Sequence, residues 1–547
     1  MSRRTAAALL ALIALYFLYS TRGGLSAFFT GDDGMNIVSL HGLWRISLGS
    51  LAVNSLLPFT TEYRPVGGLF YRLIWAAAGF NPLPFRIACF VLMLANLGLV
   101  YCVMSRIAKN RIAAVFGVLF FAYHPCLGDL YYSTGTVYDL LCLFFYCASL
   151  LAYFRGMRFI AVTLLFILAL NSKEMALTLP MVLLLYEALL GGGLRPLWAR
   201  RYAPLALALV IAAVSLISRI WGPHALTVNP LYRPTFRPTL IFNALGRYGA
   251  YLLDRVTPFS AMWVGLGFAA LLIVGLILRD RVYLFALLFT VLTSIPVCLI
   301  PPRAGFVLYV PMIGWALLAG RLLQHTNPQR QWVLASVFIV VLGALVAVHA
   351  SARETSTSQF EAQHQNTRSL FSQLRRMQPS FPPGSRILFS DDPYAPDDWI
   401  LLFLTQLAYN DPIIWVDRRK KILGVGAASE DYPYDYTFLF RTGVLTAIRE
   451  ETVNLEFEPK RLKPGDTYKV TVPKLAGKIV DVSIVVTRGG KITYTGVVRG
   501  WCRFDSRGVA ALLTPNSVEL GTVRVKHIRP QGGKWMPAFG SVELAAN

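Results

Sequence analysis

The sequence predicts an α-helical polytopic membrane protein with a C-terminal soluble α/β segment and a small β-sandwich. Three observations support this fold class. The chain of 547 residues is 55% hydrophobic and only 15% charged, whereas soluble domains average about 25% charged residues. Apolar runs long enough to cross a bilayer recur as far as residue 350. After His349 the chain becomes polar, and it later alternates with the two-residue period of β-strands.

The apolar runs predict about 11 transmembrane helices. We expect them near residues 5–21, 85–105, 111–124, 136–154, 158–171, 174–191, 202–221, 260–279, 282–300, 305–323 and 331–350. The short turns between alternate helices are all basic: 106–111, 155–158, 195–201, 279–281 and 321–330. Since cytoplasmic loops carry the excess of Lys and Arg, the N-terminus is expected inside and the C-terminal region outside.

The first apolar run follows Arg3 and Arg4, as in a signal peptide, but no clear cleavage site comes after it. We therefore interpret it as a retained first span. The short inner turns, and the lack of a typical eukaryotic retention signal, favour a bacterial inner membrane with a periplasmic or extracellular C-terminal region.

The C-terminal part divides into a connector and two kinds of fold. Residues 351–380 are expected to be a helical connector, and 385–420 read as a strand, a helix and a strand, over Arg386–Ser390, Asp398–Leu407 and Ile413–Val416. From about residue 450 the pattern is β, with strands expected at Tyr468–Val472, Val482–Val486, Ile492–Val498, Val523–Ile528 and Val542–Leu544. Gly489-Gly490 predicts a tight hairpin. The expected domains are 1–350, 351–450 and 451–547.

The charge pattern argues against a nucleic-acid-binding protein, and the cysteines form no zinc-binding motif. The formal net charge is +23, but many basic residues lie in short clusters between apolar runs, and no nucleic-acid-binding module is present. Basic residues of the C-terminal third suit anionic lipid or lipid-linked phosphate. The sequence has no CxxC pair and no His/Cys cluster at zinc spacing.

The segment Thr30–Asn36 holds two adjacent carboxylates, Asp32 and Asp33, where the first apolar helix leaves the membrane. An ionisable residue against the bilayer is costly and indicates function. The alternative is that the two acids end a helix, with Gly31 and Gly34 in the turn.

The acids belong to a long outer loop, 22–84, and a second outer loop spans 222–259. Long outer loops beside tight inner turns indicate that the chemistry faces outward. Within the first loop, Gly34–Leu51 and Pro65–Ala78 look amphipathic and are expected to lie along the membrane surface.

Five further segments share an order along the chain that is typical of one enzyme superfamily. They are Tyr63–Val66 continuing to Pro82, Phe121–Pro125, Tyr132–Leu141, Asn171–Pro180 and Arg303–Pro311. With these segments the chain, over roughly residues 10–325, resembles the GT-C superfamily of membrane glycosyltransferases that use polyprenyl-phosphate sugars. It is most similar to the transmembrane and tetratricopeptide-repeat O-mannosyltransferases and their bacterial relatives. The repeat region of that branch is absent, which leaves the acceptor open.

The resemblance implies that an Asp of the first outer loop is the catalytic base. A sugar on a lipid phosphate already carries a good leaving group, so the enzyme must deprotonate and orient the acceptor hydroxyl. Neighbouring carboxylates raise one another's pKa, which suits a base. We favour Asp32 as base and Asp33 as its positioning partner or a metal ligand, with the reverse assignment open. A divalent cation, Mg²⁺ or Mn²⁺, bridging Asp32 or Asp33 to the phosphate is left open.

The donor phosphate requires cations at the membrane surface. The topology places Arg64, Arg303 and Lys173 there, and the resemblance adds His124. The alternatives are interfacial anchoring for Arg303 and Arg64, a Lys173–Glu174 ion pair, and a structural role for His124. The matching segments also contribute Glu174, Asp139, Tyr63 and Tyr309, with N-capping of a helix as the alternative role of Asp139.

These expectations describe an inverting glycosyltransferase at the outer membrane face. It would move a monosaccharide from a polyprenyl-phosphate carrier to a protein, lipid or glycan hydroxyl. Three alternatives remain: a flippase or transporter of lipid-linked sugars, a non-catalytic scaffold, and a transferase of the same superfamily that modifies lipid A or a cell-wall glycan. Transporters usually show internal repeats and buried midplane charges, neither of which is visible here.

Overall fold

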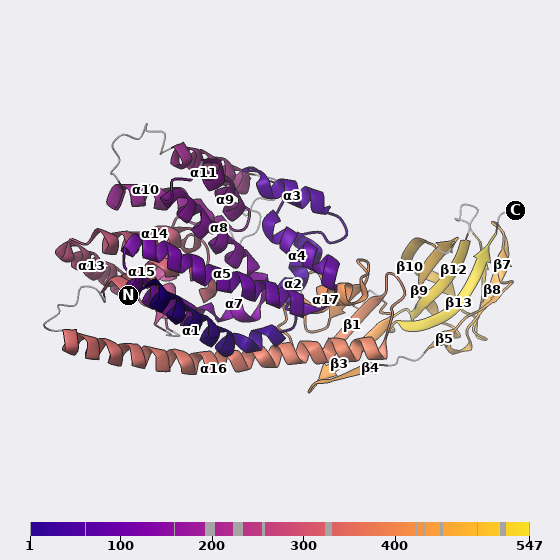
Figure 1. Cartoon of the computed structure of the whole chain (residues 1–547). Helices are drawn as coiled ribbons and strands as arrows, with labels where there is room; N and C mark the ends of the chain where they lie inside the picture. Colours follow the sequence, from indigo (N-terminus) through magenta and orange to yellow (C-terminus); the bar gives the residue numbers. More distant parts are fainter. Residues whose placement is uncertain are drawn as a thin grey trace. The chain divides into compact units, whose positions relative to one another are not determined.

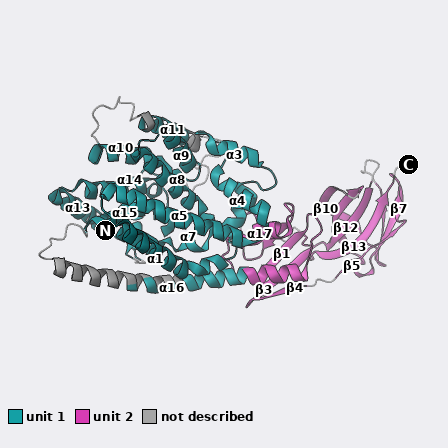
Figure 2. Ribbon diagram, viewed as in Figure 1, with its two compact units in different colours: residues 1–367 teal, residues 368–547 magenta. Residues whose placement is uncertain are grey.

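The computed structural model describes residues 2–60, 62–157, 159–191, 203–221, 233–253, 257–322, 331–422, 424–429, 433–448, 452–489, 491–514 and 521–545. The chain forms two compact units, Met1–Thr367 and Arg368–Asn547 (Figure 2). The first unit is helical, and the second contains the strands (Figure 1). The predicted fold class is thus confirmed in its main division, and the three domain boundaries drawn from the sequence stay a prediction.

The helical unit consists of helices joined by short turns. Its described helices of eight residues or more are α1 (Arg3–Thr21), α3 (Leu48–Leu56), α4 (Pro65–Ala78), α5 (Pro82–Ala108), α6 (Arg111–Tyr123), α8 (Val137–Phe154), α9 (Phe159–Leu170), α10 (Leu179–Leu189), α11 (Ala203–Trp221), α12 (Pro238–Leu252), α13 (Ala261–Leu278), α14 (Arg281–Cys298), α15 (Met312–Leu322) and the start of α16 (Gln331–Met377). Side chains of Asn81, Asn110 and Asp280 accept hydrogen bonds from the first turns of α5, α6 and α14. These caps explain why those helices begin where they do.

Five described helices are long and apolar enough to cross a membrane: Arg3–Ser26, Pro82–Ala108, Thr134–Phe154, Ala261–Leu278 and Arg281–Cys298. A sixth span is formed if α6 and the following Pro125–Tyr132, bent by 57°, count as one. These helices confirm an integral membrane protein. The expected total of about 11 is not confirmed, because several of the other predicted spans are helices of 10–17 residues.

The two amphipathic segments of the first outer loop differ in structure. Pro65–Ala78 is a single helix, α4. Gly34–Leu51 is not: it contains the end of α2 (Gly31–Met35), a π-helical turn over Asn36–Leu40, a bend and the start of α3. Gly42, with φ at +49°, stands in that bend. A left-handed residue cannot continue a right-handed helix, so the two helical pieces are separate.

The predicted last span and the predicted connector form one continuous helix, α16, of 47 residues. Within the helical unit, the Tyr132 hydroxyl donates to Thr357 Oγ1 at 3.0 Å, and the ring of Tyr132 stacks on Phe360. The described part of α16 is therefore fixed against the segment that precedes α8.

The second unit begins with a small α/β fold. β1 (Arg386–Asp391) pairs in parallel with β2 (Trp415–Arg418), and α17 (Ile400–Tyr409) connects them. The predicted strand–helix–strand unit is confirmed. β3 (Tyr436–Arg441) pairs with the other side of β1, and β4 (Val444–Ile448) completes the order β2-β1-β3-β4.

Two further sheets follow. One has the order β10-β9-β12-β13-β5, with β7 on β13, and the other has the order β11-β8-β6. Their strands are β5 (Val453–Asn454), β6 (Glu456–Glu458), β7 (Arg461–Leu462), β8 (Thr467–Thr471), β9 (Ile479–Arg488), β10 (Lys491–Arg503), β11 (Val509–Leu513), β12 (Gly521–Pro530) and β13 (Met536–Leu544). Buried residues of both sheets, such as Val470 and Val482, share one hydrophobic core. This arrangement is the predicted β-sandwich. The hairpin between β9 and β10 is present, although Gly490 lies outside the described residues.

Candidate active site

The acidic pair lies on α2, the short helix that follows the first span. Thr30 caps this helix: its Oγ1 accepts from Asp33 N at 3.3 Å, and Asp33 Oδ2 accepts from Thr30 N at 2.8 Å. This reciprocal capping box places Asp33 at the third helical position and fixes its side chain. The alternative drawn from the sequence, that the two acids end a helix with Gly31 and Gly34 in the turn, is therefore wrong in its geometry: both acids lie in the first turn of α2, which begins at Gly31.

Asp32 and Asp33 differ in exposure because consecutive helical residues point in different directions. Asp33 is fully buried, and its Oδ1 has no hydrogen-bond partner among the described residues. Burial raises the pKa of Asp33 to about 6, and the Asp32 charge adds to this while the Thr30 backbone and Arg86 oppose it. Asp32 keeps an exposed surface. It is thus the member of the pair that a substrate can reach.

Protein atoms nevertheless surround Asp32 on most sides. This partial burial raises the pKa of its carboxyl, and the positive charge of Arg303 lowers that pKa part of the way. Gly135 forms one wall: a Cβ added there would lie 2.9 Å from Asp32 Cβ. A carboxylate that is partly desolvated yet accessible is a stronger base than one in open water.

Arg86, which the sequence analysis missed, anchors the backbone around the pair. It is 1% exposed, and it donates to Gly24 O at 2.8 Å, to Thr134 Oγ1 at 3.1 Å and to Tyr131 O. These acceptors belong to the 3₁₀ turn Arg22–Ser26, which precedes α2, and to the segment Gly128–Thr136, and the Arg86 charge acts on Asp33. The sequence does contain a signal that could have identified Arg86, because it is a single arginine near the start of an otherwise apolar helix.

Asp129, on α7 (Gly128–Tyr132), is a second residue that the sequence analysis missed. It lies near enough to Asp32 for the two negative charges to repel each other. Its sequence, Leu127-Gly128-Asp129-Leu130, carries no motif that would have identified it. The fold alone brings these two acids, about 100 residues apart, to the same site.

Arg303 is the one predicted phosphate ligand whose charge the structure brings to Asp32. It stands just before the 3₁₀ turn Gly305–Leu308, and its backbone N donates to the Tyr248 hydroxyl at 3.3 Å. The Arg303 residue is partly exposed, although its Nε is buried. An arginine presents a planar fork of donors that matches phosphate oxygens, so this position suits an anion beside Asp32.

Arg64 and Lys173 are both buried and paired with carboxylates. Arg64 makes a bidentate pair with Glu174, Nε to Oε1 at 3.2 Å and Nη2 to Oε2 at 2.6 Å. Lys173 Nζ lies 2.5 Å from Asp139 Oδ1. The expected alternative for Lys173, a pair with Glu174, is wrong: Lys173 is extended (φ −162°, ψ 149°), so neighbouring side chains point to opposite sides. The role of Arg64 and Lys173 as phosphate ligands stays a prediction.

His124 is buried and bonded to backbone on both ring nitrogens. Nδ1 accepts from Cys126 N at 3.4 Å, so Nε2 carries the proton and donates to Leu252 O at 3.2 Å. These contacts match the structural alternative. Tyr309 is likewise buried and packs on Phe121 with ring centroids 5.0 Å apart.

Tyr63 belongs to an aromatic cluster beside the site. Its ring lies 4.8 Å from the Arg64 guanidinium and 6.0 Å from the ring of Tyr138. The Tyr138 hydroxyl lies 2.6 Å from His41 Nε2, and burial lowers the pKa of His41 to about 3. His41 is therefore neutral. The cluster connects the Arg64–Glu174 pair to the segment Thr30–Asn36, here called the acidic loop.

The acidic pair does not offer two ligands to one metal ion. Asp33 is buried and uses Oδ2 to cap α2, so only Asp32 faces outward. Among the described residues, no group of three or more His, Cys, Asp or Glu side chains could hold a metal. We therefore derive no step through Mg²⁺ or Mn²⁺.

The site thus contains an accessible carboxylate, Asp32, and a neighbouring arginine, Arg303. Two buried ion pairs, Arg64–Glu174 and Lys173–Asp139, lie in the same helical unit. Residues 62–221 match the family model of dolichyl-phosphate-mannose-protein mannosyltransferases. This match supports the resemblance to membrane glycosyltransferases that use polyprenyl-phosphate sugars.

The solved structures that are similar to the chain include two of ArnT from Cupriavidus metallidurans. The form bound to undecaprenyl phosphate has 14% sequence identity and a TM-score of 0.48, over 76% of this chain and 86% of that one. The apo form has 14% identity and a TM-score of 0.47, over 75% and 86%. No curated protein matches the chain.

Proposed function

We propose that this protein is an inverting membrane glycosyltransferase. It takes a monosaccharide from a polyprenyl-phosphate carrier and transfers it to a hydroxyl of a protein, lipid or glycan at the outer membrane face. The observation that carries the proposal is the contrast within the acidic pair. Asp33 is buried and caps the start of α2, whereas Asp32 is exposed, partly desolvated and next to Arg303.

The residues divide the reaction between them. Asp32 accepts the proton of the acceptor hydroxyl while that oxygen attacks the anomeric carbon from the side opposite the phosphate. The bond between the anomeric carbon and the phosphate oxygen breaks, and the polyprenyl phosphate leaves with the bonding electron pair. Arg303 offsets the negative charge that develops on the departing phosphate. A single displacement of this kind inverts the anomeric centre.

The surrounding residues supply preorganisation. The capping box of Thr30 and Asp33 fixes the direction of Asp32, and Arg86 holds the two segments beside it. Gly135 leaves the room that the Asp32 side chain occupies. Because these groups are in place before substrate binds, little reorganisation is needed in the transition state.

The test uses purified protein in detergent with a panel of polyprenyl-phosphate sugars. Sugar release from the lipid is followed for wild type, Asp32→Asn and Asp33→Asn. We expect release by wild type, its loss in Asp32→Asn, and partial activity in Asp33→Asn, whose amide oxygen can still accept from Thr30 N. If wild type consumes no donor but moves a labelled lipid-linked sugar across vesicles, the protein is a transporter and the proposal is wrong.

A further inference from the structure

A large pocket lies between α1, α5, α6 and α8, away from the acidic pair. Its volume is about 1140 Å³. Its walls come from the start of α1, the end of α5, the turn that leads into α6, and the end of α8. The proposed mechanism uses none of these residues.

The charged residues that line this pocket are all basic. They are Arg3, Arg106, Lys109, Arg111 and Arg155, and no Asp or Glu lines the pocket. Arg106 Nη2 donates to a backbone carbonyl, Phe154 O, at 3.2 Å. Because a carbonyl has no formal charge, this hydrogen bond does not neutralise the guanidinium. Like charges held around one concave space repel one another, and an anion inside it would relieve that repulsion.

The remaining lining is largely apolar. Leu10 of α1, Tyr101 of α5, Ile112 of α6 and Leu151 of α8 contribute to the wall. A free inorganic anion would use the basic side chains alone. A ligand with a phosphate at one end and a hydrocarbon chain at the other uses both parts of the lining.

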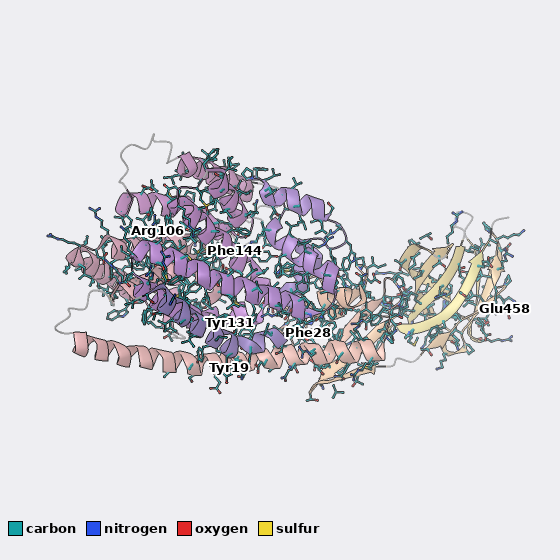
Figure 3. All side chains as sticks on the ribbon, viewed as in Figure 1. Tyr19, Phe28, Arg106, Tyr131, Phe144 and Glu458 are labelled. Atoms are coloured by element: carbon teal, nitrogen blue, oxygen red, sulfur yellow. The ribbon has the colours of Figure 1, made fainter. Side chains whose placement is uncertain are left out.

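The pocket and the acidic pair lie at opposite ends of the same helices. α1 runs from Arg3 at the pocket to Thr21 near the acidic loop, and its 19 residues span about 28 Å at 1.5 Å per residue. α5 runs the other way, from the end that bears Arg86 to the end that bears Arg106. Figure 3 shows Arg106 and Phe28, which precedes the acidic loop, well apart in the helical unit. The pocket is thus a separate site.

We propose that this pocket binds the headgroup of an anionic phospholipid from the leaflet opposite the acidic site. The phosphate lies among the five basic side chains, and an acyl chain runs along the apolar wall between α1 and α6. By the positive-inside rule, the basic turns place this pocket at the cytoplasmic face, where anionic lipid is available. The lipid joins the first helix to the ends of α5 and α8.

The chain provides a matched control for testing this proposal. The turn between α5 and α6 has Lys109 at φ +51° and then Arg111 at the first helical position. The turn between α13 and α14 has the same design, with Arg279 at φ +48° and Arg281 at the first position. Neither Arg279 nor Arg281 lines the pocket. Two double variants, Lys109→Gln/Arg111→Gln and Arg279→Gln/Arg281→Gln, therefore remove equal charge from similar turns.

The experiment titrates the full-length protein in detergent with phosphatidylglycerol or phosphatidylcholine and counts bound lipid by native mass spectrometry. We expect wild type to bind phosphatidylglycerol more tightly than phosphatidylcholine. Lys109→Gln/Arg111→Gln should bind phosphatidylglycerol about tenfold more weakly, and the control double variant should match wild type. Melting temperatures in phosphatidylcholine check that both variants fold.

Three results would overturn the proposal. One is equal binding of the two lipids by wild type. Another is equal loss in both double variants, because the charge of the whole face and not the pocket would then select the lipid. The third is full displacement of phosphatidylglycerol by millimolar inorganic phosphate, which would identify a free anion as the ligand.

Discussion

At the residue scale, the two adjacent acids illustrate what the sequence can and cannot predict. Their position after the first span indicated a site, but the sequence left open which of them is accessible. The capping box decides this, because it turns Asp33 inward and leaves Asp32 exposed. Arg86 and Asp129 were not predicted, since each reaches the acidic loop only through contacts between distant segments. Lys173–Glu174 was wrongly paired because adjacency in sequence does not bring extended side chains together.

The buried Asp33 predicts a specific dependence of stability on pH. Folding raises its pKa from 3.8 to about 6, so the folded state binds the proton more tightly than the unfolded chain does. The contribution of this group to stability is therefore greatest below about pH 4, and it falls as the pH rises towards 6. Asp33→Asn cannot ionise and escapes this loss.

We expect the melting temperature of Asp33→Asn, relative to wild type, to rise between pH 4 and pH 6 and then stay constant. Thermal unfolding in detergent at several pH values measures this difference. A difference that does not change with pH would contradict the burial of an ionisable Asp33.

At the element scale, patterns local in sequence were predicted well. The strand–helix–strand unit around β1, α17 and β2 appears where alternation and apolar runs placed it. The break of Gly34–Leu51 into separate helical pieces was not predicted, because its apolar spacing hides the bend at Gly42. The ion pairs Arg64–Glu174 and Lys173–Asp139 could not be predicted from the sequence. Each joins segments that are far apart along the chain: the start of α4 or α8 and the segment before α10.

The Lys173–Asp139 pair gives an element-scale prediction. Lys173→Met leaves the Asp139 carboxylate buried without its partner, which should destabilise the helical unit by about 3–5 kcal/mol. Lys173→Met/Asp139→Leu removes both charges and should recover most of that loss. Thermal unfolding of the two variants and wild type makes the comparison. If the double variant is as unstable as the single one, the pair does not join α8 to the segment before α10.

At the scale of the whole molecule, charge is distributed unevenly between the two ends of the helices. The acidic loop lies at one end of α1, α5 and α8, and the basic pocket lies at the other. The basic turns and the acidic pair are both visible in the sequence, and which of the two ends faces the cytoplasm stays a prediction. The number of spans could not be fixed in the same way, because apolar helices of 10–17 residues look like spans in a hydropathy pattern.

This polarity predicts the orientation in the membrane. An alkaline phosphatase fused to the C-terminus should be active, because the strand-rich unit is expected outside the cell. A green fluorescent protein fused after Lys109 should fluoresce, because that turn is expected inside. The opposite pair of signals would reverse the topology and move the acidic site to the cytoplasmic face.

In the proposed reaction, Asp32 acts in the chemical step and Arg303 holds the donor phosphate. The most direct test measures donor affinity and the single-turnover transfer rate separately for wild type, Asp32→Asn and Arg303→Gln. We expect Asp32→Asn to bind donor normally and to lose about 10²–10⁴-fold in rate. Arg303→Gln should bind donor more weakly and also transfer the sugar more slowly, because it no longer offsets the charge on the departing phosphate. An Asp32→Asn protein that transfers sugar at the wild-type rate would show that Asp32 is not the catalytic base.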